Sequence, residues 1–386
     1  MVASERVDHH RPKAGTFPTW RPRTSSWTAS IPSKAWPFAE GHIWRFSRAF
    51  RYMGAWRRPG RNAPYPPGAR WMTWWNTGGK WDFLGDWLWP GAKGVNGDTR
   101  ETLFFNNCFW IYNLQTASRI AGALGKVEAA ARYRARAEQA RQAVHAAFYG
   151  ADPPGYVNNQ QATLAIALLV GLPPKVIEPA VWKRFEEEIL IHRRGHFWGG
   201  ITGGYFVVKA LIEFDRPDLM YRMATQTGYP GWADMIRRGA TTLWESWEGD
   251  KSLLHSSYLH VGAWFMEGLA GIRPDPEHPG YQHFVIKPPL PTQTALDWVK
   301  ASYNSQYGPI VSHWRIRNGR YESQVTIPSN TTATLYLPLS GESIREGRRS
   351  LAEARGVTVR ERTKTRTVLL LQSGRYLFEG KIGRDE

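Results

Sequence analysis

The sequence predicts a mainly α-helical region followed by an all-β domain. Three observations carry this prediction. Helical apolar stripes joined by short turns fill residues 98–270, short β-rich segments follow residue 288, and 386 residues are enough for two or three domains. We place the boundaries at residues 1–80, an irregular basic segment, 81–284, the helical domain, and 285–386, a β-sandwich.

The first 80 residues have an unusual composition. They hold 14 Lys and Arg against 3 Asp and Glu, with 8 Trp and 9 Pro but no Leu, and they carry +11 of the net charge of +17. A nucleic-acid-binding arm, a disordered leader and a translation in the wrong reading frame are the alternatives. We favour the third, because the segment has no recognised binding motif and its Trp content is unusual for disorder. Translation of the upstream DNA in its other two frames tests this hypothesis.

Helices are predicted in pairs from residue 98 onward. Asp98 and Glu101 have the spacing of a capping box, and an apolar stripe continues to residue 124, where Gly125 ends the helix. The Ala-rich residues 126–148 complete a helical hairpin. The later helices are predicted at residues 160–170, 175–191, 204–214, 217–226 and 255–270. Serial helix pairs of this kind predict a toroid or solenoid of helical hairpins.

The segments after Pro288 and Pro289 are short and rich in β-branched and aromatic residues, as strands are. Turn sequences such as Asn318-Gly319 separate them. Strands are predicted at residues 298–303, 310–317, 321–327, 333–337, 357–362, 367–371 and 374–379. Together they predict a β-sandwich of about 100 residues.

Several classes of protein are excluded. A single cysteine, Cys108, forms no internal disulfide and no multi-cysteine metal site. The longest apolar run, residues 162–170, is far shorter than the roughly 20 residues that span a bilayer. Because the N-terminus has no apolar signal-peptide core, we expect a cytoplasmic protein. His192 and His196 have no accompanying acid, so no metal site is predicted there.

The densest group of candidate catalytic residues lies at 241–250. Glu245, Glu248 and Asp250 fall within six residues, and Trp244 and Trp247 stand beside them. Glycoside hydrolysis requires a pair of carboxyl groups across the scissile bond. A Trp wall would offer the sugar an apolar face and tune a carboxyl pKa. The alternative is a polar loop whose acids pair with Arg237, Arg238 or Lys251.

A second cluster, residues 81–90, holds three Trp and two Asp, among them Asp86 and Trp87. Rigid aromatic rings suit a sugar subsite, and core aromatics that lead into a helix are the alternative. His255, at the predicted start of the last helix, suits a ligand of a sugar hydroxyl, and a helix-capping histidine is its alternative.

These motifs resemble bacterial α-L-rhamnosidases of glycoside hydrolase family 78. The most specific one is residues 239–247, Gly-Ala-Thr-Thr-Leu-Trp-Glu-Ser-Trp. The others are residues 85–88, 227–232, 261–272, 302–308 and 327–334, with His255. The resemblance runs in order from about residue 79 to 339. It implies an (α/α)6 six-hairpin barrel followed by a β-sandwich, and inverting hydrolysis of terminal α-L-rhamnose without a metal.

The resemblance also implies roles for single residues. Glu245 matches the general base that activates water, and Glu248 has a secondary role. Positions that line or support the rhamnose pocket are matched by Asp86, Trp87, Trp244, Trp247 and His255. The implied partner is a carbohydrate substrate, and we expect no cofactor, no nucleic acid and no membrane.

One part of the family pattern is missing from the sequence. The family's general acid lies in an Asp-Glu-Arg-rich run, and residues 1–80 contain no such run. Because inversion requires an acid and a base roughly 6.5–9.5 Å apart, we expect an incomplete barrel that is poorly active by itself. The alternatives are a non-catalytic glycan-binding remnant and another (α/α)6 enzyme, such as an unsaturated-uronyl hydrolase or a polysaccharide lyase.

Overall fold

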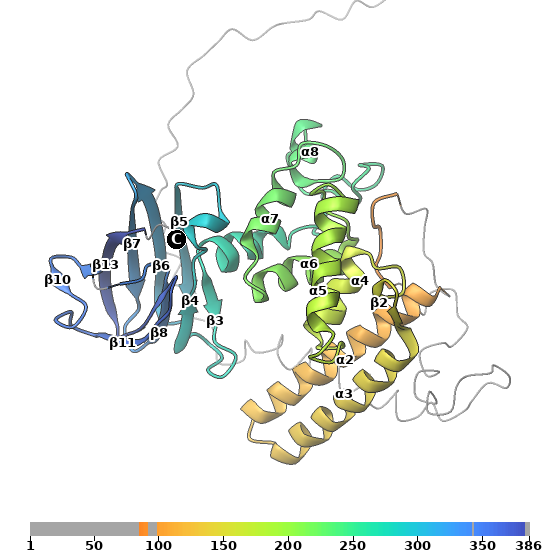
Figure 1. Cartoon of the computed structure of the whole chain (residues 1–386), viewed down its shortest axis with the longest axis horizontal. Helices are drawn as coiled ribbons and strands as arrows, with labels where there is room; N and C mark the ends of the chain where they lie inside the picture. Colours follow the sequence, from red (N-terminus) through yellow and green to blue (C-terminus); the bar gives the residue numbers. More distant parts are fainter. Residues whose placement is uncertain (1–84, 92–98, 342, 383–386) are drawn as a thin grey trace, which may run out of the picture. The chain divides into compact units, whose positions relative to one another are not determined.

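The structure, a computed structural model, describes residues 85–91, 99–341 and 343–382. The predicted segment 1–80 and Asp98 lie outside the described residues. In the described part, a helical region comes first and a β region follows it (Figure 1). This order of helical and β regions confirms the predicted fold class.

Paired helices build the helical region, as the sequence predicts (Figure 1). The hairpins are α2 (Arg100–Ala123) with α3 (Val127–Phe148), α4 (Gln161–Leu169) with α5 (Glu178–Glu187), and α6 (Ile201–Glu213) with α7 (Pro217–Ala224). A π-helix, Glu188–His192, prolongs α5. Short elements complete the region: β1 (Tyr149–Ala151), β2 (Pro154–Tyr156), α8 (Trp232–Arg237), α9 (Val261–Ala263) and a second π-helix, Trp264–Leu269.

Several predicted helix starts are wrong: α5 begins at Glu178 rather than at residue 175, and α6 begins at Ile201 rather than at residue 204. The first helix begins at Arg100, and the Thr99 side chain caps it by accepting a hydrogen bond from the Thr102 N–H at 3.2 Å. The last helix begins at Val261, so His255 lies in the loop before it. The Ser257 hydroxyl lies 2.6 Å from His255 Nδ1. Local side-chain bonds of this kind compete with helix formation, which explains the late start.

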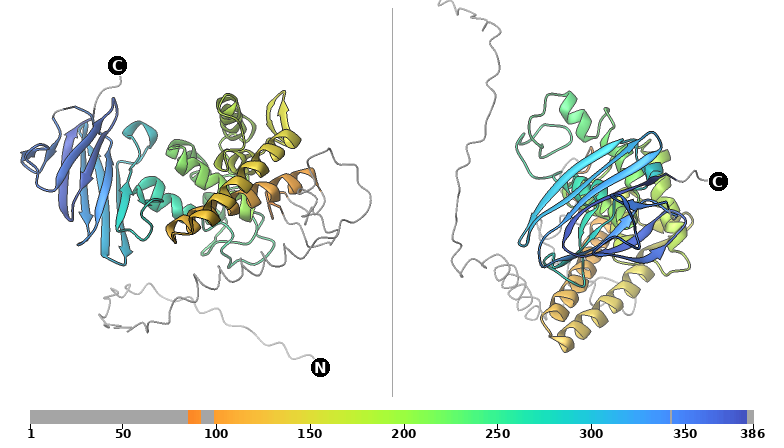
Figure 2. Two further views of the ribbon diagram at one scale, coloured as in Figure 1. Left: turned by 90° about the horizontal axis from the view of Figure 1, so that it is seen from below. Right: turned by 90° about the vertical axis from the view of Figure 1, so that its left-hand side faces the viewer.

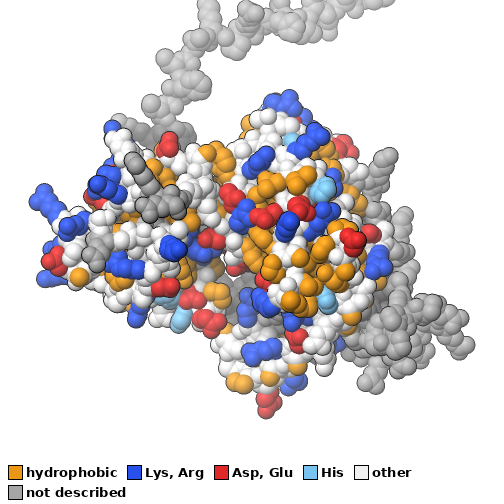
Figure 3. All heavy atoms as spheres, in the orientation of Figure 1, with side chains coloured by type: hydrophobic (Ala, Val, Ile, Leu, Met, Phe, Trp, Pro, Cys, Tyr) orange, Lys and Arg blue, Asp and Glu red, His pale blue; other side chains and the backbone are white. Residues whose placement is uncertain are grey.

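The core of the helical region centres on α4. Every residue from Gln161 to Leu168 is buried, as expected of a helix that neighbours cover on all sides. Phe104 and Ile111 of α2 and Phe206 of α6 belong to the same apolar cluster. Large apolar side chains also remain exposed on this region (Figure 3), the most exposed being Val176 (86%), Leu254 (75%) and Val127 (74%).

Two sheets form the β region (Figure 2). The six-stranded sheet has the order β10 (Arg349–Ser350), β9 (Arg345–Glu346), β13 (Gly374–Lys381), β7 (Arg320–Ile327), β6 (Gly308–Arg317) and β5 (Trp298–Ser305). The five-stranded sheet has the order β11 (Val357–Arg362), β12 (Thr367–Leu371), β8 (Thr332–Leu337), β4 (His283–Ile286) and β3 (Ile272–Pro274).

The two sheets share one apolar core. Trp314 and Phe378 of the six-stranded sheet belong to the same buried cluster as Phe284, Leu335 and Leu369 of the five-stranded sheet. β4 and β8 pair in parallel, whereas the other strand pairs are antiparallel. Alternate residues are buried along β7, the period of a strand with one covered face. The arrangement is therefore the predicted sandwich.

The β region begins earlier along the chain than the sequence predicts. β3 precedes the predicted boundary at residue 285 and β4 crosses it, yet both are strands of the five-stranded sheet. They have 3 and 4 residues, too few for a recognisable alternation of apolar and polar positions. None of the helices in the described segments has the length and apolarity that a membrane span requires.

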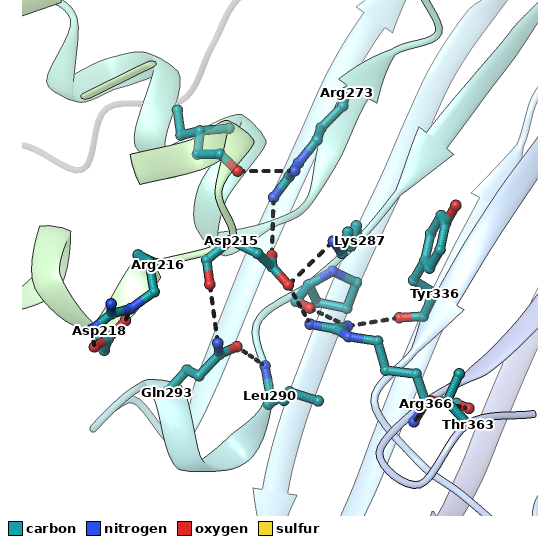
Figure 4. A network of polar contacts seen from close by, with 12 residues as sticks. Asp215, Arg216, Asp218, Arg273, Lys287, Leu290, Gln293, Tyr336, Thr363 and Arg366 are labelled. Carbon is teal, nitrogen blue, oxygen red and sulfur yellow. Dashed lines mark hydrogen bonds and ion pairs between the residues drawn. The ribbon is translucent and has the colours of Figure 1, made fainter. Parts of the chain in front are cut away.

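One carboxylate links the helical region to the β region (Figure 4). Asp215 lies in the turn between α6 and α7, and its φ of 58° places it in the left-handed region. Its carboxylate is 3.2 Å from Lys287 Nζ, 3.4 Å from the Arg366 guanidinium and 3.6 Å from the Arg273 guanidinium. Its backbone carbonyl accepts a hydrogen bond from Gln293 Nε2 at 3.0 Å.

The cations around Asp215 also bond to the backbone of both regions. Arg366 donates to the carbonyls of Pro288 at 2.8 Å and Tyr336 at 3.2 Å, while Arg273 donates to the carbonyl of Ile212 at 3.1 Å. Burial lowers the pKa of Lys287, and the neighbouring Asp215 carboxylate acts in the opposite direction. The turn at Asp215 is therefore fixed to the β region by charge and by hydrogen bonds together.

Candidate active site

The acidic loop, residues 242–255, is closed by bonds between its two ends. Glu245 N–H donates to the Ser252 carbonyl at 2.9 Å, and His255 N–H donates to the Leu243 carbonyl at 2.8 Å. Inside the loop the Ser246 hydroxyl donates to the Asp250 carboxylate at 2.6 Å, and this bond lowers the pKa of Asp250. The loop is thus held by its own backbone, which fixes where Glu245 lies.

Glu245 has the least engaged carboxylate of the predicted site. It is partly buried, and its Oε2 accepts a hydrogen bond of 3.3 Å from the Ser252 N–H. Within the described ranges no hydrogen bond to its Oε1 is recorded. A carboxylate in this state can accept a proton from a water molecule.

Glu248 instead connects three segments. Its Oε1 accepts hydrogen bonds from the Tyr229 hydroxyl and, at 2.8 Å, from the Gly91 N–H. Burial and this contact with Glu248 raise the pKa of the Tyr229 hydroxyl. Glu248 therefore ties the acidic loop to residues 85–91 and to the turn before α8.

Asp86 binds the beginning of α6. Its two carboxylate oxygens accept hydrogen bonds of 2.7 Å from the Gly200 and Gly203 N–H groups, where the helix dipole favours an anion. Burial raises the Asp86 pKa to about 6, although these backbone donors act in the opposite direction. A Cβ on Gly203 would lie 2.3 Å from Asp86 Oδ2, so only glycine allows this close approach.

The predicted Trp wall is not an open surface. Trp247 is fully buried, stacks on Tyr258 with ring centroids 3.9 Å apart and donates to the Gly199 carbonyl at 2.8 Å. Trp244 is buried beneath the Arg238 guanidinium, which lies 4.6 Å from its ring centre. A fully buried Trp247 does not line an open pocket, and its role in supporting one stays a prediction.

The predicted site residues come from two segments that the fold brings together. Glu245, Glu248 and His255 belong to the acidic loop, and His255 is exposed at its end. Asp86 and Trp87 belong to residues 85–91, which reach that loop through the bond from Gly91 to Glu248. Trp87 is partly exposed, and its carbonyl accepts a bond of 2.7 Å from the Ile201 N–H.

Sequence reasoning missed two tyrosines and misplaced one arginine. Tyr229 bonds to Glu248, and Tyr258 donates to the Leu88 carbonyl at 3.0 Å. Arg238 pairs with Asp234 at 2.9 Å and donates to the Glu248 backbone carbonyl at 2.8 Å. It therefore holds the loop backbone and, among the described contacts, forms no ion pair with the loop acids. Only the resemblance of residues 227–232 could have pointed to Tyr229.

A histidine with a buried ring nitrogen, His260, packs against Tyr258 and gives a pH prediction. Burial lowers the pKa of His260 to about 3, while an unfolded histidine titrates near 6.5. The contribution of the neutral ring to stability is therefore complete above about pH 6.5 and is lost as the pH falls toward about 3. We expect His260→Gln to flatten the fall of the melting temperature between pH 7 and pH 4. The control is His255→Gln, a variant at an exposed histidine, which should keep the pH dependence of the melting temperature of the unchanged chain. If His260→Gln also kept that pH dependence, protonation of His260 would not be the cause of the loss of stability.

Paired helices followed by a β-sandwich agree with the class of six-hairpin glycosidases, and the matches to two domain families show this class. The chain belongs to the bacterial α-L-rhamnosidase family. Residues 3–269 match the bacterial alpha-L-rhamnosidase 6 hairpin glycosidase domain, and residues 271–352 match the C-terminal domain of the same family. The six-hairpin fold predicted from the resemblance is thereby confirmed.

Relatives of known name agree. An alpha-L-rhamnosidase of Formosa agariphila is 29% identical over 310 residues, which are 77% of this chain and 33% of the relative. One of Streptomyces avermitilis is 27% identical over 269 residues, 67% of this chain and 25% of the relative. The chain thus spans about a third or less of the length of these relatives.

Solved structures show the same fold. The alpha-L-rhamnosidase from Dictyoglumus thermophilum superimposes with a TM-score of 0.69 at 24% identity, over 77% of this chain and 34% of that one. The Streptomyces avermitilis enzyme, complexed with L-rhamnose, gives a TM-score of 0.67 at 24% identity, over 77% of this chain and 28% of that one.

Proposed function

We propose that the chain hydrolyses terminal α-L-rhamnosides with inversion, and that Glu245 is the general base. Membership of the rhamnosidase family supports the reaction. The assignment of Glu245 rests on one observation, the number of hydrogen bonds that each carboxylate of the candidate site already accepts. Asp86 accepts hydrogen bonds at both carboxylate oxygens and Glu248 Oε1 accepts two, whereas in the described segments the Glu245 carboxylate accepts a single bond of 3.3 Å.

In this mechanism the acidic loop positions the base. The bonds between Ser252 and Glu245 hold the carboxylate at the closed end of the loop, and Arg238 fixes the loop backbone from outside. The carboxylate accepts a proton from water, and the water oxygen then forms a bond to the anomeric carbon as the bond to the leaving oxygen breaks. Glu248 and Tyr229 keep residues 85–91 against the loop, so that Asp86 and Trp87 support the sugar position.

The proposed mechanism also requires a general acid. An inverting enzyme needs a second carboxyl group that protonates the leaving oxygen. The residues 1–80 lack the family's acidic run, and Asp86 and Glu248 are already engaged. We therefore propose that this chain hydrolyses rhamnosides slowly by itself. Loss of a general acid costs about 10²–10⁴-fold in rate.

A rate comparison tests this. We expect slow nitrophenol release from nitrophenyl α-L-rhamnoside by the purified chain. Replacement of residues 1–84 by the segment that precedes the matched region of the Streptomyces avermitilis relative should raise the rate by about 10²-fold or more, because the family pattern places the general acid there. Fast release by the unchanged chain would contradict the missing acid. No release by either protein would contradict the proposed substrate.

The second candidate function is glycan binding without catalysis, and the engaged state of the other carboxylates favours it. The chain has 20 Trp, and Trp244 and Trp247 belong to the acidic loop, so its fluorescence should respond to a ligand at the site. Saturable quenching by L-rhamnose, combined with no turnover even after the upstream replacement, would support binding alone.

A further inference from the structure

A cavity of about 470 Å³ lies in the β region, apart from the candidate active site. The connection between β3 and β4, the turn between β7 and β8, and the turn between β12 and β13 meet around it. All nine residues that line it have polar side chains. Its volume falls within the range of about 300–1,000 Å³ that is typical of small-molecule sites.

One wall of this cavity is held by a histidine between two hydroxyls. His283 of β4 has Nδ1 2.6 Å from the Thr332 hydroxyl and Nε2 3.0 Å from the Thr334 hydroxyl, both on the parallel neighbour β8. Burial lowers the pKa of His283, so its ring is neutral near pH 7. Both ring nitrogens are thus occupied, and the ring keeps one orientation.

The connection between β3 and β4 is braced in a similar way. The Asp275 carboxylate accepts hydrogen bonds of 2.9 Å from the Glu277 N–H and 2.9 Å from His278 Nδ1. Gln306 of the β5–β6 turn donates to the Gly280 carbonyl at 2.9 Å, and the ring of Tyr281 lies 4.8 Å from that of Tyr303. The cavity is therefore formed before any ligand enters.

The remaining lining groups have hydrogen-bonding capacity to spare. The side-chain amides of Gln282, Asn330 and Gln372 are exposed, and no hydrogen bond to any of them is recorded in the described part of the chain. Each amide offers an acceptor oxygen and two donor hydrogens. The three come from three different connections, so they surround the cavity rather than cover one side of it.

The charge of the lining selects the kind of ligand. Neither Lys nor Arg lines the cavity, and recognition of carboxylate or phosphate normally uses one of them. A metal ion is also disfavoured, because no group of three metal-binding side chains occurs among the described residues and both His283 nitrogens are bonded. A neutral molecule whose groups both donate and accept hydrogen bonds fits this lining.

We propose that this cavity is a binding site for a neutral saccharide, separate from the acidic loop. Sugar hydroxyls donate and accept in turn, which matches a rim of three amides and a carboxylate. The site does not depend on Glu245 and does not rest on the proposed hydrolysis. In a glycosidase it would hold a second sugar of the same glycan or of a neighbouring one.

Histidine NMR tests the proposal directly. The full chain, labelled with ¹⁵N in its histidines, is titrated with methyl α-L-rhamnoside and, in a second series, with methyl α-D-glucoside. We expect the ring signals of His278 and His283 to shift in a saturable way with at least one of the two sugars, and single His→Gln variants assign these signals. No shift of either signal, up to the solubility limit of both sugars, would overturn the proposal.

A pair of variants adds a second criterion. The double variant Gln282→Ala, Gln372→Ala should weaken this binding by about tenfold, because two amide contacts are lost. Asn330 is left unchanged, since its φ of 61° is strained for alanine. The control is Gln324→Ala, which removes an exposed amide from β7 outside the cavity and should leave the affinity unchanged. Equal affinities for the double variant and the control would overturn the assignment of the amides.

The test of sugar binding in this cavity can be separated from the test of the proposed hydrolysis. The double variant should release nitrophenol at the rate of the unchanged chain, whereas Glu245→Gln should keep the histidine shifts. A double variant that loses hydrolysis in proportion to sugar binding would show that the cavity belongs to the active site, against the proposal.

Discussion

Replacement of Glu245 by Gln is expected to lower rhamnoside hydrolysis by about 10²-fold or more. Glutamine keeps the size of the side chain and can still accept the Ser252 N–H bond, but its amide does not take a proton from water. The loop should therefore keep its shape while the base is lost. The rate of nitrophenol release is the measurement, made in the protein that carries the replaced upstream segment so that a large decrease can be detected.

Asp250→Asn is the matched control for Glu245→Gln. Asp250 is an exposed carboxylate of the same loop, and it bonds to the Ser246 hydroxyl rather than to water at a catalytic position. We expect its variant to retain most of the rate. NMR of the first product formed should show β-L-rhamnose, as inversion of an α-linkage requires. Equal rates for the two variants, or α-L-rhamnose as the first product, would rule out Glu245 as an inverting base.

Replacement of Asp215 by Asn should give the largest loss of stability. The variant removes the negative charge that faces Arg273, Lys287 and Arg366 and leaves three partly buried cations close together (Figure 4). Breaking a buried ion pair by removing one partner costs about 3–5 kcal/mol. Because 25% of the Asp215 side chain is exposed, we expect about 2–3 kcal/mol in the free energy of unfolding by urea.

Asp218→Asn supplies the comparison for Asp215→Asn. Asp218 pairs with a single cation, Arg216, at 2.8 Å and is 38% exposed, so its loss should cost about 1 kcal/mol or less. Addition of salt to about 1 M should reduce the loss of unfolding free energy caused by each substitution. The fractional reduction should be larger for Asp218→Asn, because its ion pair with Arg216 is more exposed. If Asp215→Asn were no more destabilising than Asp218→Asn, the carboxylate would not be the link between the two regions.

The elements that sequence reasoning found are those with a repeated local pattern. α2 and α3 have many turns over which an apolar stripe is repeated, and β6 and β7 alternate over 10 and 8 residues. β3 and β4 were missed because 3 or 4 residues carry no such repeat. Their place in the sheet comes from the parallel pairing with β8, a contact between distant segments.

The sequence indicates candidate site residues but not their surroundings, and the roles of these residues stay predictions. Residues 241–250 were recognisable from their chemistry, because carboxylates beside Trp are unusual in a surface loop. The burial of Trp247 had no local signal, since an aromatic ring serves a core or a sugar equally well. The partners of Asp86 could not be anticipated either, because the N–H groups it binds lie 114 and 117 residues away.

The attachment of residues 85–91 has a consequence for the order of folding. The hydrogen bonds from this segment to Gly200, Gly203, Glu248 and Tyr258 span 114 to 170 residues of chain. Contacts that close such long loops form late, after the local helices, because the entropy of closure must be overcome first. The segment that brings Asp86 to the acidic loop is therefore expected to dock last and to detach first. The candidate site would then be assembled only when the rest of the chain has folded.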